Sequence, residues 1–136
     1  MTVSVQIEHL GVTYSAEVMT IKKTNLGYED HGLLTASLVL EGNGTGVVFG
    51  GYALDSKPAE RGADRGGTAY GLDHIIQIMR TVGVSSWEAL TCQKVFALYL
   101  GGNGHWGQQI EGIANINSGA AFIPKEHAKA WLEAAS

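Results

Sequence analysis

The chain has 136 residues, of which 45% are hydrophobic, and its net charge is −4 at pH 7. This length is typical of one domain and is sufficient to bury a core without disulfide bonds. Three arginines and six scattered lysines cannot form a broad basic face, so duplex nucleic acid is not an expected partner. No apolar run approaches the roughly 18 residues that span a membrane, and the N-terminus does not resemble a signal peptide. These features predict a cytoplasmic protein with no membrane partner.

The contents of cysteine, glycine and charged residues further narrow the class of protein that the sequence can encode. Cys92 is the only cysteine, which excludes an internal disulfide. It lies between Thr91 and Gln93, shortly before Val95 and Phe96, and is interpreted as a small buried side chain rather than a nucleophile. The 19 glycines are about twice the usual share of ~7% and indicate tight turns or places where a ligand approaches the backbone. Charged residues make up 16%, below the usual ~25%, which fits a protein that covers part of its surface in an oligomer.

The first half of the chain has the period-two pattern of β-strands. Val3, Val5 and Ile7 alternate with polar residues, and a similar alternation follows over residues 14–19. Residues 33–41 and 47–54 form two further apolar segments. The dipeptide Asn43-Gly44 between them is a strong hairpin signal, so these two strands are expected to be antiparallel neighbours.

A helix is predicted after the polar segment 55–67. The apolar residues that repeat with helical spacing are Leu72, Ile75, Ile76 and Met79. Thr68 is the expected N-cap, and Gly83 stands where a C-terminal glycine is expected. The residues expected to face solvent are Asp73, His74, Gln77 and Arg80.

The last third adds shorter elements. Ser85 with Glu88 three residues later predicts a capping box, and residues 94–100 predict a strand covered on both faces. Residues 108–116 are a candidate closing strand, and Pro124 is the expected first residue of a final helix. The expected buried residues of that helix are Ala128, Trp131 and Leu132. The order of elements predicts an α+β fold, a mostly antiparallel β-sheet followed by helices, in one domain spanning residues 1–136.

The strongest binding signal lies at the start of the predicted long helix. Arg61 and Arg65 precede Gly66, Gly67 and Thr68. A helix N-terminus offers unpaired N–H groups and a positive dipole end, glycines let a ligand approach, and arginine forks phosphate bidentately. This combination suits a phosphate or pyrophosphate, although the segment is neither a Walker loop nor a dinucleotide fingerprint. The alternative is a solvated loop whose arginines pair with neighbouring acids.

A second signal is the glycine-rich segment 101–107. Its ligand-binding candidates are Asn103, His105 and Trp106: the indole offers a flat face for a base, and the amide can read a base edge. A hairpin turn with Trp106 packed on the sheet explains the same residues.

Catalytic signals are weak. Tyr28 to Gly32 combine two carboxylates with a histidine, but successive strand residues point to opposite faces, so an acidic turn is the favoured interpretation. The histidines lack metal-ligand spacing, and no serine-centred nucleophile motif is present. We therefore expect no enzyme activity, no cofactor and no metal.

Four segments carry a resemblance to a known family. They are Leu26–Ala36, Phe49–Asp55, Gly66–Gly71 and Thr81–Val84. Over about residues 20–100 the chain resembles the Thoeris anti-defence 1 family of small phage proteins, which sequester cyclic ADP-ribose isomers and, in some members, cyclic oligonucleotides. The resemblance implies a sheet followed by helices, assembled as dimers or higher oligomers with ligands at subunit interfaces.

The resemblance also implies roles for individual residues. Arg61 or Arg65 matches a loop arginine that holds phosphate, and aromatic residues hold bases. No arginine follows Arg80, so the family's C-terminal arginine has no counterpart here.

The expected function is therefore that of a phage immune-evasion protein, a homo-oligomer in the infected cell that binds a cyclic nucleotide without cleaving it. Two alternatives remain. One is a small nucleotide-hydrolysing enzyme that uses Asp30, His31 or His105. The other is a non-catalytic phage structural or protein-interaction module.

Overall fold

The fold is organised around one long strand, β2 (Val12–Asp30). The computed structural model describes residues 5–30, 33–42, 44–56, 66–100 and 109–135. Along one edge, β2 pairs with β1 (Val5–His9) and then with β3 (Leu33–Gly42). Along the other edge, residues 15–20 of β2 pair with β7 (Lys94–Leu100). One strand thus joins the N-terminal hairpin, the central sheet and the C-terminal strands.

The remaining strands extend this sheet in both directions. β4 (Thr45–Ala53) adds to β3, while β8 (Gly112–Ala114) and β9 (Ala121–Phe122) follow β7, giving the antiparallel order β4-β3-β2-β7-β8-β9. Two short strands, β5 (Asp55–Ser56) and β6 (Gly66–Gly67), form a separate ladder. The sheet confirms the predicted α+β class.

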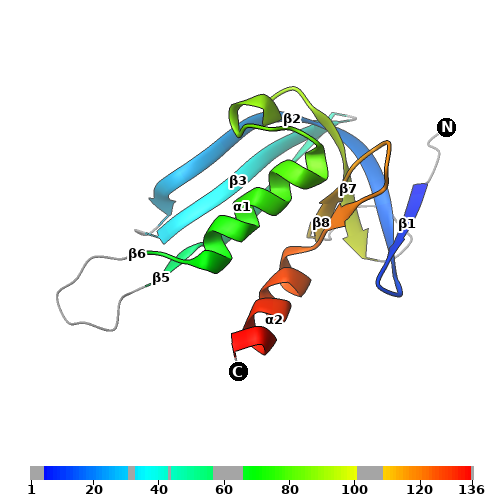
Figure 1. Ribbon diagram of the computed structural model, residues 1–136. Coiled ribbons are helices and arrows are strands. Elements are labelled where there is room, and N and C mark those ends of the chain that lie inside the picture. The colour runs from blue at the N-terminus through cyan, green and yellow to red at the C-terminus, as the bar shows by residue number, and fades with distance from the viewer. Residues whose placement is uncertain (1–4, 31–32, 43, 57–65, 101–108, 136) are drawn as a thin grey trace.

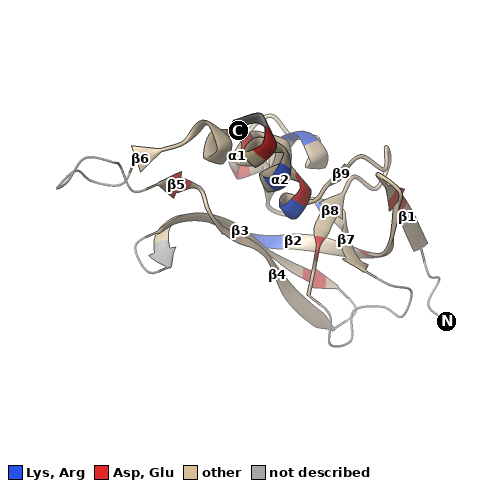
Figure 2. Cartoon of the chain, turned by 90° about the horizontal axis from the view of Figure 1, so that it is seen from below, with Lys and Arg blue, Asp and Glu red and all other residues tan. Residues whose placement is uncertain are grey.

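Two helices lie on one side of the curved sheet (Figures 1 and 2). They are α1 (Ala69–Val82) and α2 (Pro124–Ala135), and a 3₁₀ turn, η1 (Glu88–Leu90), connects α1 to β7. The curvature brings the far ends of the sheet together: the rings of Phe49 in β4 and Phe122 in β9 lie 6.4 Å apart. The main core therefore fills the concave side of the sheet beneath α1.

The core occupies both faces of β7, as the apolar sequence of that strand predicted. Ala97 and Tyr99 belong to the main cluster, which includes Ile78 of α1. Leu98 points to the other face and packs with Tyr14 and Ala114 in a second, smaller cluster. Both faces of the strand are thus covered.

Both predicted ends of α1 are confirmed. The hydroxyl of Thr68 accepts a hydrogen bond from the Gly71 N–H at 2.8 Å and donates one to the Leu54 carbonyl at 2.7 Å. Gly83 has a φ of 90°, and its N–H donates to the Met79 carbonyl. The last helix begins at Pro124, also as predicted.

The predicted orientation of α1 is wrong. Its buried residues are Gly71, His74, Ile78, Thr81 and Val82. His74, expected to face solvent, is fully buried, whereas Leu72, expected to be buried, is 62% exposed. The cause is close backbone packing: a Cβ on Gly71 would lie 2.0 Å from the Leu54 carbonyl oxygen. This contact turns the glycine toward the sheet and moves part of the apolar stripe to the flank of the helix.

Several predictions about single side chains are also wrong. Cys92 is exposed, with a φ of 75°, because it sits in the turn before β7, where its N–H donates to the Ile21 carbonyl. Leu132 is 73% exposed on the outer side of α2. The hydroxyl at the start of η1 comes from Ser86, not Ser85, and accepts from the Ala89 N–H.

Two predicted boundaries also change. Residues 108–116 were expected to form one closing strand. In the described part of this segment, only Gly112–Ala114 (β8) pair with β7. The acidic segment after Tyr28 continues β2 as far as Asp30, so only residues 31–32 separate it from β3; these two lie outside the described residues.

Replacing Gly71 with alanine should strongly destabilise the fold, because the new Cβ would meet backbone that cannot rotate away. Overpacking of this kind typically costs about 1–3 kcal/mol of the free energy of unfolding. Urea unfolding followed by circular dichroism measures the loss. Gly67→Ala is the matched control, because no atom lies within 4 Å of its Cβ. Equal stability of the two variants would contradict the packing role of Gly71.

Candidate functional site

The candidate site is the entrance to α1, which the β5–β6 ladder holds in place. Asp55 pairs with Gly67 and Ser56 with Gly66, so residues 57–65 are closed at their base by two paired strands. Asp55 is anchored to the sheet, because its carboxylate accepts a hydrogen bond from the Leu34 N–H at 3.1 Å. Cβ atoms built on the two glycines would meet no atom within 4 Å. The surface in front of this glycine pair is therefore open.

The first turn of α1 supplies the electrostatics of this entrance. The N–H groups at the first positions of any helix have no acceptor within the helix, and the dipole adds positive potential there. In α1, Thr68 already satisfies the Gly71 N–H, and the Thr68 hydroxyl proton is committed to the Leu54 carbonyl. Thr68 therefore shapes the entrance by capping the helix and tying it to the sheet.

Five of the eight residues predicted to bind ligand lie outside the described residues. They are Arg61, Arg65, Asn103, His105 and Trp106. Their roles stay predictions. The structure places the other three, Gly66, Gly67 and Thr68, consecutively at the α1 entrance.

An aromatic–histidine cluster lies beside the entrance. Its members are Tyr52, Tyr70, His74, Phe122, His127 and Trp131. Tyr70, in the first turn of α1, is stacked on His127 of α2 with ring centroids 5.2 Å apart. Burial raises the pKa of Tyr70, so its phenol stays protonated near neutral pH. The cluster thus places half-buried aromatic surface next to the start of α1.

An aspartate joins the two helices beneath this cluster. The Asp73 carboxylate lies 2.7 Å from His127 Nε2 and accepts a longer hydrogen bond, 3.4 Å, from the Trp131 indole. The hydrogen bond with His127 holds the pKa of Asp73 below its usual value. Sequence reasoning missed this contact, because 54 residues separate the two partners and neither shows a motif.

This Asp–His pair has the chemistry of a general base but not the geometry. A catalytic histidine needs its second nitrogen within reach of a substrate. The Nδ1 of His127 is buried and has no hydrogen-bond partner in the structure. The pair therefore fixes α2 against α1, and the second ring nitrogen of His127 is covered by the described residues.

His74 is the most deeply buried polar residue of the cluster. Its side chain is fully buried, and neither ring nitrogen has a hydrogen-bond partner within the described part of the chain. Burial, with a smaller contribution from the nearby His127, lowers the pKa of His74 from 6.5 to about 4. The ring is therefore neutral at physiological pH and acts as an aromatic packing element.

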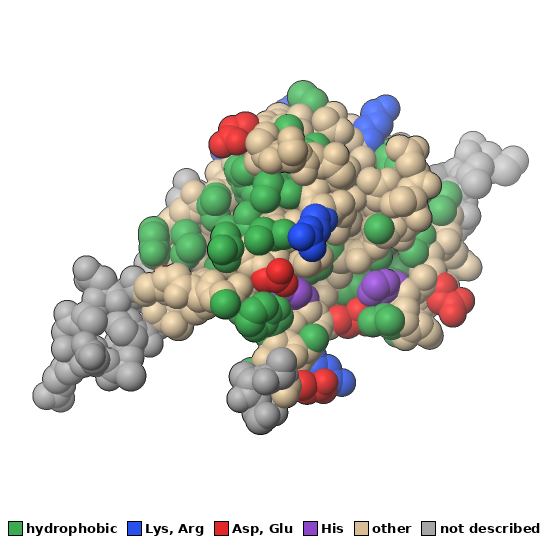
Figure 3. All heavy atoms as spheres, in the orientation of Figure 1, with side chains coloured by type: hydrophobic (Ala, Val, Ile, Leu, Met, Phe, Trp, Pro, Cys, Tyr) green, Lys and Arg blue, Asp and Glu red, His purple; other side chains and the backbone are tan. Residues whose placement is uncertain are grey.

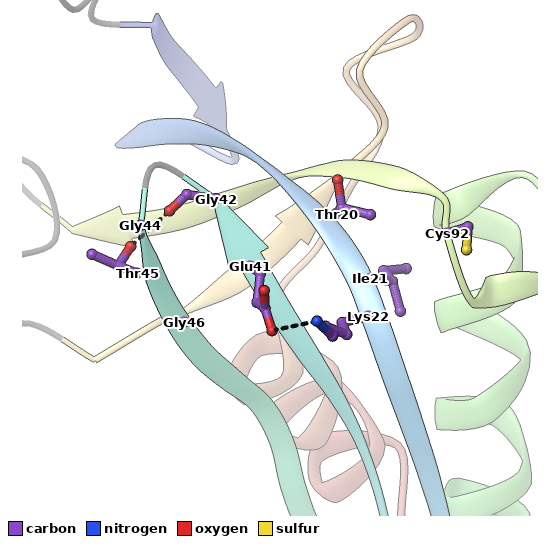
Figure 4. A pocket seen from close by; sticks show the side chains of 9 residues that line it. All are labelled: Thr20, Ile21, Lys22, Glu41, Gly42, Gly44, Thr45, Gly46 and Cys92. Atoms are coloured by element: carbon purple, nitrogen blue, oxygen red, sulfur yellow. Dashed lines mark hydrogen bonds and ion pairs between the residues drawn. The ribbon is translucent and has the colours of Figure 1, made fainter.

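A separate groove of about 790 Å³ lies between β2, the β3–β4 turn and Cys92 (Figure 4). Lys22 and Glu41 point toward one another across the two strands, with Nζ and Oε2 3.4 Å apart. Because the carboxylate offsets the only cation of this lining, the groove is a poorer anion site than the α1 entrance.

No family model matches the chain, and neither a curated protein nor a solved structure matches it. Among the described residues, no three histidine, cysteine or acidic side chains are placed to hold a metal ion. Within the same ranges, no helix combines the length and apolarity needed to span a membrane.

Protonation of His74 should make stability depend on pH. Between pH 6.5 and about 4 the unfolded state binds a proton that the folded state excludes, so stability should fall as the pH is lowered through this window. The two pKa values correspond to a loss on the order of 3 kcal/mol by pH 4. Urea unfolding of the wild type and of His74→Phe at pH 7.5 and pH 4.5 measures the difference.

The variant should lose most of this pH dependence, whatever its stability at pH 7.5. His9→Gln is the control for loss of a histidine outside the aromatic–histidine cluster, because His9 lies in β1 and its partner is Glu126. An unchanged pH dependence in His74→Phe would show that other groups cause the acid sensitivity.

Proposed function

We propose that the protein binds and sequesters a cyclic nucleotide signalling molecule, a cyclic ADP-ribose isomer or a cyclic oligonucleotide, without cleaving it. The observation that carries this proposal is the position of the β5–β6 ladder. It closes the segment that contains Arg61 and Arg65 directly before the N-terminus of α1. The proposal thus rests on a helix N-terminus that follows two glycines, with Arg65 preceding them in the sequence.

The chemistry of the entrance suits a phosphate group. Gly66 and Gly67 leave open space in front of the backbone, so an anion can approach the first N–H groups of α1. An arginine directly before these glycines can add a bidentate hydrogen bond to the same phosphate. The net negative charge of the chain does not prevent phosphate binding, because the hydrogen bonds from the arginine and from the helix N–H groups act at short range.

The adjacent aromatic residues suit a base. Tyr52, Tyr70 and Trp131 are partly exposed, and they lie on β4, α1 and α2 around the same end of the helix. Stacking contributes about 1–3 kcal/mol per base and tolerates different bases. Tyr52, Tyr70 and Trp131 are the described residues best suited to stack on a nucleotide, and the role of Trp106 stays a prediction.

Sequestration requires tight binding, because free messenger activates its effector. A nanomolar dissociation constant corresponds to about 12 kcal/mol. Two phosphates and one stacked base can provide this only when the pocket is formed before the ligand arrives. The hydrogen bonds of Asp55 and Thr68, which fix the hairpin and the helix to β3 and Leu54, support such preorganisation.

The defining test is capture followed by release. Purified protein is incubated with messenger, separated from unbound nucleotide and heat-denatured, and the released nucleotide is analysed by mass spectrometry. Intact messenger is the expected product. Recovery of a cleaved or altered nucleotide would contradict sequestration and favour the hydrolase alternative.

Arg61→Ala and Arg65→Ala test the anion site. A charge-assisted hydrogen bond contributes about 1.5–3 kcal/mol, so loss of the phosphate-binding arginine should weaken binding roughly 10- to 100-fold in calorimetry. Arg80→Ala is the matched control, because Arg80 lies exposed in the last turn of α1, at the opposite end of the helix. Unchanged affinity in both loop variants would place the phosphate elsewhere.

A further inference from the structure

Among the described strands, none pairs with one edge of the second half of β2. β7 pairs with β2 only as far as Thr20, and Ile21 makes the last backbone hydrogen bonds on this side, to Cys92 and Gln93. From Lys22 onward, β3 continues to pair with the other edge of β2, but no described strand pairs with this one. A free edge presents a row of backbone donors and acceptors to another strand.

An apolar surface adjoins this edge. Leu72, Ile76 and Met79 form one flank of α1, which we call the α1 flank; the opposite flank carries Asp73 and contacts α2. Leu72 is 62% exposed. Figure 3 shows hydrophobic side chains gathered over α1 and the adjoining ends of β2 and β3. Contiguous apolar surface of this kind marks an interaction site.

Leu26 links the free edge to the α1 flank. It is paired in register with Ala36, which is buried and lies two residues before Leu38 of the main core. Residues paired in register point to the same face of a sheet, so Leu26 points to the face that carries α1. Leu26 is nonetheless 45% exposed. Leu26 therefore adds exposed apolar surface at the edge of β2, on the face of the sheet that carries α1.

The order of charged residues along β2 indicates which partner fits this edge. Lys22 and Lys23 begin the free segment, Glu29 and Asp30 end it, and Leu26 lies at its centre. β2 shifts register against β3 between Ile21 and Lys23 and again between Gly27 and Asp30, so both charged ends of the segment are bulged. Antiparallel pairing with its own copy, centred on Leu26, sets the bulge at one end of each copy opposite the bulge at the other end of its partner. It thus brings Lys23 and Lys22 of one copy beside Glu29 and Asp30 of the other. Parallel pairing would align like charges, which is unfavourable. The segment is thus complementary to itself in one orientation.

We propose that a second copy of this chain docks on the β2 edge, with the two β2 strands antiparallel about a two-fold axis at Leu26. An axis perpendicular to the sheet keeps both α1 helices on the same face. The Leu26 side chains then oppose one another, and the α1 flanks of the two copies face each other above the joined sheets. This dimer does not depend on any ligand, so it can be tested separately from the proposed function.

Sedimentation of the full-length protein tests the surface. The wild type should be a dimer, and Leu26→Asp and Leu72→Glu should each raise the dissociation constant by at least about tenfold, because they place a charge in apolar contact. Val48→Asp is the matched control: Val48 is 61% exposed but lies on β4. Circular dichroism confirms that each variant is folded. A monomeric wild type, or a dimer that responds only to Val48→Asp, would overturn the proposal.

Charge reversal tests the register. Lys23→Glu and Glu29→Lys should each weaken the dimer, since each aligns like charges twice across the two-fold axis. The double variant restores opposite charges and should recover an affinity close to that of the wild type. Additive weakening in the double variant would exclude this register.

Cross-linking tests the axis itself. In a Cys92→Ser background, which leaves no other cysteine, Leu26→Cys should form an intermolecular disulfide under mild oxidation, because directly opposed residues lie close together. Thr24→Cys is the control, since in this register it opposes Tyr28 of the other copy. Equal cross-linking of the two variants would overturn the central position of Leu26.

Discussion

The backbone contact between Gly71 and Leu54 determines most of what is distinctive in this fold. The Leu54 carbonyl accepts the Thr68 hydroxyl and lies where a side chain at position 71 would be. Helix α1 therefore approaches the sheet along its glycine side at its first turn. This orientation buries His74, joins Asp73 to α2 and leaves Leu72 on the flank.

The Gly71–Leu54 contact bears on both proposals, the anion site at the start of α1 and the dimer surface on its flank. At the first turn it holds the N-terminus of α1 against the β5–β6 ladder, where an anion can meet free N–H groups. Along the helix it leaves Leu72 exposed on the flank that we propose to face a second copy of the chain. The proposed ligand site and the proposed dimer surface thus lie on different sides of one helix.

Local signals in the sequence predicted the elements well. Alternation located the strands, and Thr68 and Gly83 located both ends of α1, because capping depends on residues close in the chain. The rotation of α1 was not predictable in this way. The pattern of Leu72, Ile75, Ile76 and Met79 indicates an apolar side, but the buried side is chosen by a glycine contact with a distant carbonyl. Cys92 was misplaced for a similar reason, since its exposure follows from a turn fixed by Ile21.

The candidate site was only partly accessible to sequence reasoning. Gly66, Gly67 and Thr68 were found because they adjoin one another and a helix start. Contacts such as Asp73 with His127 depend on how α2 returns to α1, which no local pattern records. The aromatic–histidine cluster gathers residues from β4, α1, β9 and α2, and its stacking surfaces became recognisable only in three dimensions.

The central proposal is that copies of this chain assemble and hold a nucleotide without transforming it. Native mass spectrometry of the protein purified from cells that produce the messenger tests this most directly, because it reports assembly mass and retained ligand together. The account predicts an even number of chains carrying intact cyclic nucleotide. Single chains without ligand, isolated from cells in which the messenger is demonstrably present, would contradict it.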